Sequence, residues 1–204
     1  MRAAALAGMV VASILFITGC GSESQPAARV LKVSGQVNAR VAAGEAFKQA
    51  SADMELKVGG AVRTESEASA RLQTHLDSMT IDIFADSYFE VRATGGVAGY
   101  QGEGSAAYEV KKQNNPVAIE TPHGATAVLG TKFGQRVASD SIMILVESGK
   151  VAFTSNAGEK REITAGKKLV WRVTGPLPDV AESSFIESEA FFKDGISSFE
   201  FERR

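Results

Sequence analysis

The sequence has very few of the residues that carry catalytic or metal-binding chemistry. Its 204 residues include one cysteine, Cys20, and two histidines, His75 and His123. A single cysteine excludes a disulfide within the chain, so the stability of a folded domain must come from packing. No metal-ligand spacing surrounds either histidine, and no serine stands in a G-x-S-x-G motif. We therefore expect no metal, no cofactor and no enzymatic activity, with a hydrolase as a remote alternative.

A strong charge of either sign is also missing. Lysine and arginine together number 22, and aspartate and glutamate 24, so the formal net charge is −2. Nucleic acid is bound mainly by clustered basic side chains that neutralise its phosphates. This balance gives no electrostatic reason to bind nucleic acid, and we expect no such partner.

The long apolar run of the sequence is at its start. Met1 and Arg2 precede residues 3–17, which are almost all small and apolar, and Ile17-Thr18-Gly19-Cys20 ends the run. A basic start, an apolar middle and small residues at the cut site are typical of a secretory signal peptide. A run of about 17 residues is at the short limit for a transmembrane helix. The polar residues 21–26 that follow contain no cluster of Lys and Arg, which disfavours that alternative.

Residues 17–20 resemble the lipobox of bacterial lipoproteins. The resemblance implies that residues 1–19 are removed as a signal peptide and that Cys20 is acylated on its sulfur and on its new amino group. Each buried methylene contributes about 0.8 kcal/mol, so two or three acyl chains hold a protein on a bilayer. We expect residues 20–28 to form a lipidated, flexible tether. By resemblance to sorting in enteric bacteria, Gly21 favours the outer membrane, within a bacterial cell envelope.

Short alternating segments fill the sequence from Arg29 to Val173. Apolar and polar residues alternate with the period of two that is typical of strands, and Gly, Asp, Asn or Ser interrupts them about every 8–12 residues. Residues 142–146 are continuously apolar, which predicts a central strand buried on both faces. We therefore predict an all-β domain over residues 29–175, a compact antiparallel β-sandwich or β-roll of short strands.

Two segments differ from this pattern. Residues 94–105 are rich in glycine, which predicts a mobile loop or a wide turn. Residues 176–204 form a C-terminal extension, in which Asp179 and Glu182 have the spacing of a capping box. We predict a short helix from there through Phe192, ending near Gly195, and a candidate edge strand over residues 198–202.

Aromatic side chains are the candidates for a binding surface. Tyr100 stands in the glycine-rich segment, where we expect it to be exposed. Trp171, the only tryptophan, lies in an alternating strand. If it faces inward it belongs to the core, as aromatic residues usually do, and in the opposite register it can stack on a sugar or a protein. For His75 and His123 a position at the surface or at a strand edge is favoured.

Two blocks of the sequence resemble the extracytoplasmic domain of FecR-type proteins. The first runs from Gly59 to Leu72, and the second contains Thr121-Pro122-His123-Gly124, Gly130-Thr131-Lys132-Phe133 and Glu147-Ser148-Gly149-Lys150-Val151. There are departures: Leu129 stands where the family commonly has arginine, and Gly60 where it commonly has an acidic residue. The resemblance covers residues 30–173. We expect the motif glycines and threonines to determine the fold and transfer no partner-binding residue.

The resemblance also implies a setting for the function. Well-known members span the membrane, handle a sigma factor inside the cell and sense a TonB-dependent receptor outside. No residues precede the leader here, so we expect no direct contact with a sigma factor. The expected function is a lipid-anchored, non-catalytic envelope module that binds an envelope protein or a cell-wall polymer, through an edge strand or the Tyr100 segment. The alternative is a structural scaffolding lipoprotein whose C-terminal phenylalanines contact a partner.

Overall fold

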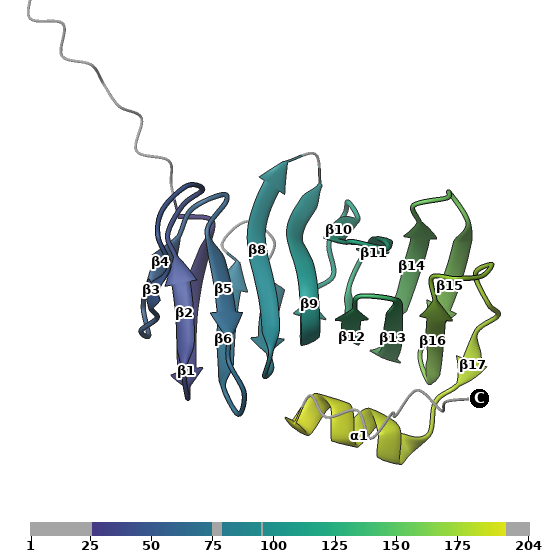
Figure 1. The fold of residues 1–204 in the computed structure, drawn as a ribbon. Helices are drawn as coiled ribbons and strands as arrows, with labels where there is room; N and C mark the ends of the chain where they lie inside the picture. The colour runs from purple at the N-terminus through teal and green to yellow at the C-terminus, as the bar shows by residue number, and fades with distance from the viewer. Residues whose placement is uncertain (1–25, 75–78, 95, 195–204) are drawn as a thin grey trace, which may run out of the picture.

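The computed structural model describes residues 26–74, 79–94 and 96–194 (Figure 1). The described residues form 17 strands and one α-helix, α1 (Phe185–Asp194). This confirms the predicted all-β class with a small helix near the C-terminus. Hydrogen bonds link the strands into one continuous, mostly antiparallel sheet, which is folded into two layers that we call sheet A and sheet B.

The strand order follows from the pairing of neighbours. Across sheet A the order is β4 (Glu55–Leu56), β1 (Ala28–Ser34), β6 (Ser69–Thr74), β7 (Met79–Ile83), β9 (Val97–Val110), β12 (Thr131–Ala138), β13 (Ser141–Ser148), β16 (Lys167–Arg172) and β17 (Ala181–Glu182). Across sheet B it is β3 (Lys48–Gln49), β2 (Val37–Arg40), β5 (Ala61–Thr64), β8 (Ser87–Thr94), β9, β10 (Val117–Thr121), β11 (Gly124–Val128), β14 (Lys150–Ser155) and β15 (Lys160–Thr164). The chain passes back and forth between the layers while it advances from one end of the molecule to the other (Figure 1).

Strand β9 joins the two layers. Its first part pairs with β8 and β10 in sheet B, and its last part, from Gly104 to Val110, pairs with β12 in sheet A. The β9–β10 pairing is parallel, whereas every other strand pairing among the described residues is antiparallel. A single strand of 14 residues therefore holds both sheets in a fixed relation.

The prediction of a mobile loop at residues 94–105 was wrong, because most of this segment belongs to β9. Its glycines allow close packing. A Cβ added at Gly99 would lie 2.2 Å from Cζ of Phe89, and one at Gly104 would lie 2.5 Å from the carbonyl oxygen of Asp86. Gly104 also has a φ of 82°, which side chains with a Cβ tolerate poorly. These glycines let β9 lie tightly against β8 and turn from one sheet into the other.

The main core lies between the two sheets. Tyr108 stacks on Phe133 with ring centroids 4.7 Å apart, and burial raises the pKa of Tyr108 well above its usual value. Strand β13 is buried on both faces, as predicted. Ile142 and Ile144 belong to the main core, and Met143 faces the other side of the sheet, under α1.

Helix α1 begins later than the sequence predicts. Its capping box is formed by Ser184 and Glu187: the Ser184 amide donates to Oε2 of Glu187 at 2.8 Å, and the Glu187 amide donates to Oγ of Ser184 at 3.2 Å. The spacing of Asp179 and Glu182 was misleading, because Glu182 lies in β17. The helix ends at Asp194, close to the predicted end. The candidate edge strand over residues 198–202 lies outside the described residues.

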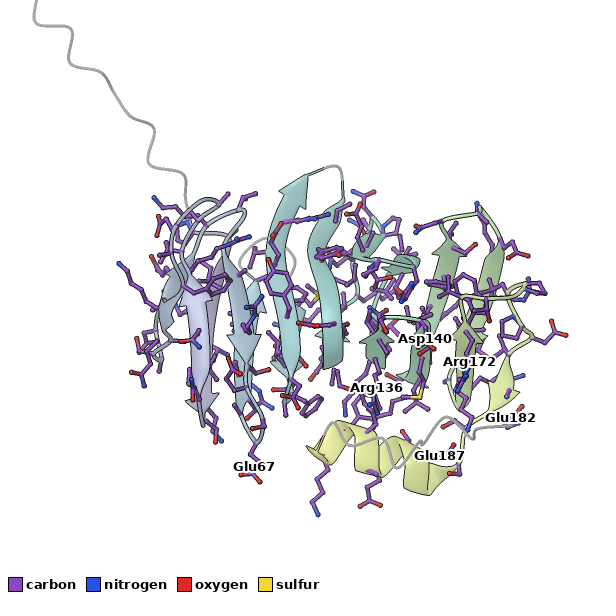
Figure 2. All side chains as sticks on the ribbon, viewed as in Figure 1. Glu67, Arg136, Asp140, Arg172, Glu182 and Glu187 are labelled. Atoms are coloured by element: carbon purple, nitrogen blue, oxygen red, sulfur yellow. The ribbon has the colours of Figure 1, made fainter. Side chains whose placement is uncertain are left out.

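Helix α1 lies outside the strands, at the bottom of the view in Figure 1, and packs on the outer face of sheet A. Phe191 is buried there in a cluster with Ala107, Met143 and Leu145. Gly134 makes room for it, because an added Cβ would lie 2.2 Å from Cε1 of the Phe191 ring. Glu187, labelled in Figure 2, accepts a hydrogen bond from Nζ of Lys168 at 2.7 Å. The helix is therefore docked on its own domain.

Residues of the sequence motifs hold turns together. Oγ1 of Thr131 donates to the carbonyl oxygen of Lys150 at 2.9 Å. Gly149 has a φ of 84°, and a Cβ added there would lie 2.6 Å from the carbonyl oxygen of Gly130. The start of β12 and the β13–β14 turn are thus held against each other. The motif residues therefore stabilise the fold, which is the role expected for them.

Candidate binding surface

The edges of both sheets leave little room for an added strand. Three of the four edge strands, β3, β4 and β17, have two residues each. At the fourth, β15, the Arg161 side chain donates to the carbonyl oxygens of Leu177 and Pro178, so this segment lies beside the strand. Short or covered edges resist strand addition. The structure therefore disfavours docking on an edge strand and directs attention to the faces.

Strand register arranges the outward side chains of sheet B in two rows. In the described part of the chain no helix lies on this face, since α1 packs on sheet A. The first row consists of Arg40, Ala61, Glu90, Tyr100 and Glu120 on consecutive strands. The second consists of Gln49, Asn38, Arg63, Tyr88 and Glu103. Opposite residues in a sheet have Cβ atoms about 5 Å apart, so each row is continuous.

We call this face the arginine–tyrosine surface. It consists of the residues of the two rows together with Phe47, Arg92 and Gly102. Ion pairs join the side chains of its first row. Nη2 of Arg40 lies 2.8 Å from Oε2 of Glu90, and Nε of Arg92 lies 3.3 Å from the other oxygen of that carboxylate. Arg92 also pairs with Glu120. Partly exposed pairs of this kind contribute about 1 kcal/mol or less each, so their main effect is to hold the side chains in place over the sheet.

The tyrosines are tied into this network. The Tyr88 hydroxyl donates to Glu90 at 3.0 Å and accepts from Arg40 at 3.2 Å. Burial, and then the hydrogen bond to Glu90, raise the pKa of Tyr88, so its phenol is protonated at neutral pH. The Tyr100 ring lies 4.6 Å from the guanidinium carbon of Arg92, a cation–π contact. Both rings are half-buried and keep one part toward solvent.

Arg63 differs from the other two arginines. Its guanidinium lies over the rings of Phe47, at 5.4 Å, and Tyr88, at 5.6 Å. None of the described residues forms a salt bridge or hydrogen bond with it, and it is exposed. Glu103, opposite Tyr88, is likewise exposed and has no ion pair or hydrogen bond to its side chain within the described residues. The surface thus presents one oriented cation and one carboxylate to solvent.

A shallow groove of about 320 Å³ lies between these side chains. Gly102 is in its wall, between the two tyrosines. A Cβ added to Gly102 would lie 2.9 Å from Cδ1 of Tyr88 and 3.2 Å from Cε1 of Tyr100. The absence of a side chain at this position lets both rings approach the backbone of Gly102 within the groove.

The two aromatic candidates for binding, Tyr100 and Trp171, lie in different environments. Tyr100 lies on this surface, although on a strand and not in the predicted loop. Trp171 is buried, with 6% of its surface exposed, and its indole Nε1 donates to the carbonyl oxygen of Gly175 at 2.9 Å. The strand adopts the inward register, so the alternative of Trp171 as a binding residue is wrong.

None of the residues of this surface is a histidine or a cysteine. His123 is in a turn, as predicted, but it is buried and its Nε2 lies 2.6 Å from the carbonyl oxygen of Ala138. The expectation of a surface position was therefore wrong for this residue. His75 and Cys20 lie outside the described residues. Residues 26–74, 79–94 and 96–194 contain no group of three or more His, Cys, Asp and Glu side chains placed to hold a metal ion. No helix within these ranges is long and apolar enough to span a bilayer.

Sequence reasoning missed the arginines and glutamates of the surface. Arg40, Arg63 and Glu120 are up to 80 residues apart in the chain, and only the strand register brings them onto one face. One local sign was available: Tyr88, Glu90 and Arg92 alternate along a single strand with buried Phe89 and Val91.

Residues 60–152 match the family model described as FecR protein. They form a FecR-type domain. The matched span runs from β5 into β14 and includes most of the arginine–tyrosine surface, while Asn38, Arg40, Phe47 and Gln49 precede it. The recognition of this family from the motif residues is thus confirmed.

Solved structures agree on the fold. Two crystal structures of a candidate anti-sigma factor from Parabacteroides distasonis each align with 65% of this chain at a TM-score of 0.57 and 14% identity. The alignment covers 64% of that protein, so the chain matches less than two thirds of its length. A likeness at this identity shows the shared fold alone. No curated protein matches the chain.

Proposed function

We propose that this chain is a lipid-anchored, non-catalytic module of the bacterial cell envelope. In this proposal its FecR-type domain acts in signalling by binding an envelope protein or a cell-wall polymer through the arginine–tyrosine surface. The observation that carries the proposal is the layout of sheet B, whose outer face has rows of fixed arginine and tyrosine side chains while the edges are short or covered. The anti-sigma-factor description of the structural neighbour is consistent with a regulatory role.

The anchor is supported by the leader and Cys20, and the structure limits how far the domain reaches from it. Ala27 and Ala28 are buried, and β1 begins at Ala28. The eight residues from Cys20 to Ala27 are joined by seven Cα–Cα steps, which span at most about 25 Å when fully extended. The proposed tether therefore keeps the domain near the bilayer surface, so its partner must also be available there.

A binding role fits the chemistry of the surface better than a catalytic role. Arginine side chains have no lone pair free to accept a proton, and the pKa of Tyr88 is raised. The carboxylate of Glu90 is held by two arginines and a phenol. Groups fixed in this way bind and orient a ligand, whereas a general base needs a carboxylate or imidazole whose pKa is near the working pH.

The scaffolding alternative has less support. It requires the C-terminal phenylalanines to contact a partner, but Phe191 is 1% exposed and packs on its own sheet. Phe192 is half-buried, with its ring 5.0 Å from Nζ of Lys132. Phe199 and Phe201 lie outside the described residues.

A site-specific photo-cross-linker tests the surface in intact cells. Placed at Tyr100 it is expected to capture a partner, and placed at Glu109 it is not. Glu109 is the matched control because it is exposed on the same strand but in sheet A. Equal capture from both positions, or none from Tyr100, would count against the surface.

The anchor has its own test. The Cys20→Ala variant should leave the membrane fraction or remain unprocessed, since no sulfur is left to acylate. Fractionation and a gel-mobility shift measure this. Membrane association and mobility identical to those of the unaltered chain would show that the anchor is wrong.

A further inference from the structure

We propose that the arginine–tyrosine surface binds an acidic glycan, that is, a chain of pyranose rings that carry carboxylates. This inference rests on the proposed function and narrows its ligand from two classes of macromolecule to one. The groove over Tyr88, Gly102 and Tyr100 holds the sugar rings, and Arg63 at its side binds the carboxylate.

Arg63 supplies the charge complementarity. Arg40 and Arg92 already face the carboxylates of Glu90 and Glu120, whereas Arg63 has none. Cation–π contacts with Phe47 and Tyr88 restrict the guanidinium before a ligand arrives. A planar guanidinium donates two parallel hydrogen bonds to a carboxylate, and less side-chain entropy remains to be lost when it is already held between two rings. Arg63 is therefore preorganised for a carboxylate.

The two tyrosines supply the platform. Both rings lie close to Gly102, which has no side chain to displace them. An aromatic face presents a negative π-surface, to which the slightly positive C–H groups on one side of a pyranose ring are attracted. The hydrogen bond from Tyr88 to Glu90 and the cation–π contact of Tyr100 with Arg92 restrict both rings, which reduces the cost of ordering them on binding. Restricted rings offer a preformed surface for a sugar ring.

A glycan suits the face of a sheet better than a peptide does. The backbone N–H and C=O groups of β5, β8 and β9 are used in ladders that lie in the plane of the sheet. A peptide lying on this face would find no backbone partner for its own amides, which must be paired when buried. Sugar hydroxyls can instead be matched by side chains, and the second row offers Asn38, Gln49 and Glu103.

The carboxylated sugars have two sources near a bacterial membrane. One is the glycan strand of the cell wall with free lactyl carboxylates, and the other is a polysaccharide of uronic acids. Both present the same chemistry to Arg63 and to the rings. Peptide-free glycan strands and oligogalacturonate serve as the two probes. A chitin oligosaccharide is the neutral control, because it has the backbone of the cell-wall strand without the carboxylates.

Binding is measured by calorimetry with the mature lipidated chain in detergent micelles. We expect at least one acidic probe to bind about tenfold or more tightly than chitin, which is the change expected from one charged hydrogen-bonded contact. Raising the salt concentration should reduce this preference. The acidic probe that binds more tightly identifies the source.

Three variants assign the contacts. Arg63→Gln should remove the preference for acidic probes and leave the weak binding of chitin, while Tyr100→Ala should weaken both. Arg71→Gln is the matched control, because Arg71 is an exposed arginine on a strand of sheet A, where it pairs with Asp82. It should bind as the unaltered chain does, and thermal unfolding confirms that each variant is folded.

The outcomes separate this inference from the proposed function. Equal binding of acidic and neutral probes, or an unchanged preference in Arg63→Gln, overturns the acidic-glycan site. Capture of a protein from Tyr100 in cells, with no glycan bound in solution, also overturns it but leaves the proposed function standing. If neither a protein nor a glycan is bound, both are wrong.

Discussion

Replacing Gly134 by alanine tests how α1 is held on sheet A. The new Cβ would lie 2.2 Å from Cε1 and 2.4 Å from Cδ1 of Phe191, too close for any real contact, so the ring must leave its site. Phe191 is 1% exposed, and burying a phenylalanine contributes about 2–3 kcal/mol. Alanine also suits a strand better than glycine by about 0.5–1 kcal/mol. The docking of α1 should therefore weaken by about 2 kcal/mol, while the core between the sheets is unaffected.

Hydrogen exchange measured residue by residue is the assay for this variant. Amides of α1 should exchange about 30-fold faster, the factor that corresponds to about 2 kcal/mol, because the helix opens locally without unfolding of the domain. Amides of the strands of sheet B should keep their protection, and a limited loss is expected only near Met143, which α1 covers in the unaltered chain. A uniform loss of protection across both sheets would refute the local-docking argument.

A double-mutant cycle checks the assigned cause. Phe191→Ala alone should weaken the docking by a similar amount. In that background the clash is absent, so Gly134→Ala should become neutral or slightly stabilising. Additive losses in the double variant would show that Gly134 acts through something other than the Phe191 ring.

Two further predictions concern the core and pH. Gln135 is fully buried; its Oε1 accepts a hydrogen bond from Oγ1 of Thr126 at 2.6 Å, and its Nε2 donates to Oε1 of Gln101 at 3.0 Å. Gln135→Leu should therefore lower the free energy of unfolding, measured by urea titration, by about 1–3 kcal/mol. Gln49→Leu, at an exposed position, is the control and should change it by less than about 0.5 kcal/mol. Burial alone would raise the pKa of Glu187, but hydrogen bonds from Lys168 and Ser184 outweigh it and lower this pKa. Its contribution to α1 docking is therefore present above the unfolded pKa of about 4.3 and is lost as the pH falls through the lower folded value. Exchange of α1 amides between pH 3 and 6 should show this loss, and Glu187→Gln should abolish it; a pH profile unchanged by the substitution would contradict the assignment.

The local sequence pattern was sufficient to predict the strands, but it was insufficient to predict the structure of the glycine-rich segment. The apolar run of β13 predicted a strand buried on both faces, because a strand between two covered faces needs apolar side chains on each of them. The glycine-rich segment was misread because glycine is equally compatible with a loop and with close packing. Phe89 and Asp86, which decide between these readings at Gly99 and Gly104, belong to other parts of the chain.

For helix α1 and for Trp171, too, the local sequence allowed two structures and tertiary contacts chose between them. Both Asp179–Glu182 and Ser184–Glu187 have capping-box spacing, and the second was selected because it places Phe191 on Gly134 and Glu187 beside Lys168. Trp171 could face either way in an alternating strand, and its pairing opposite Ile142 of β13 settled the inward direction. In each case a contact with a distant residue chose between two locally acceptable structures.

By itself the sequence determined the all-β class and the C-terminal helix, since these depend on periodicity and on turn residues that lie close together in the chain. Its motif residues also resembled the FecR-type domain. Only the tertiary structure decided that one strand joins both sheets and that Arg63, Tyr88 and Tyr100 share a face. The physical reason is strand register. A shift of one residue moves every side chain of a strand to the other face, and register is set by the packing of the whole domain.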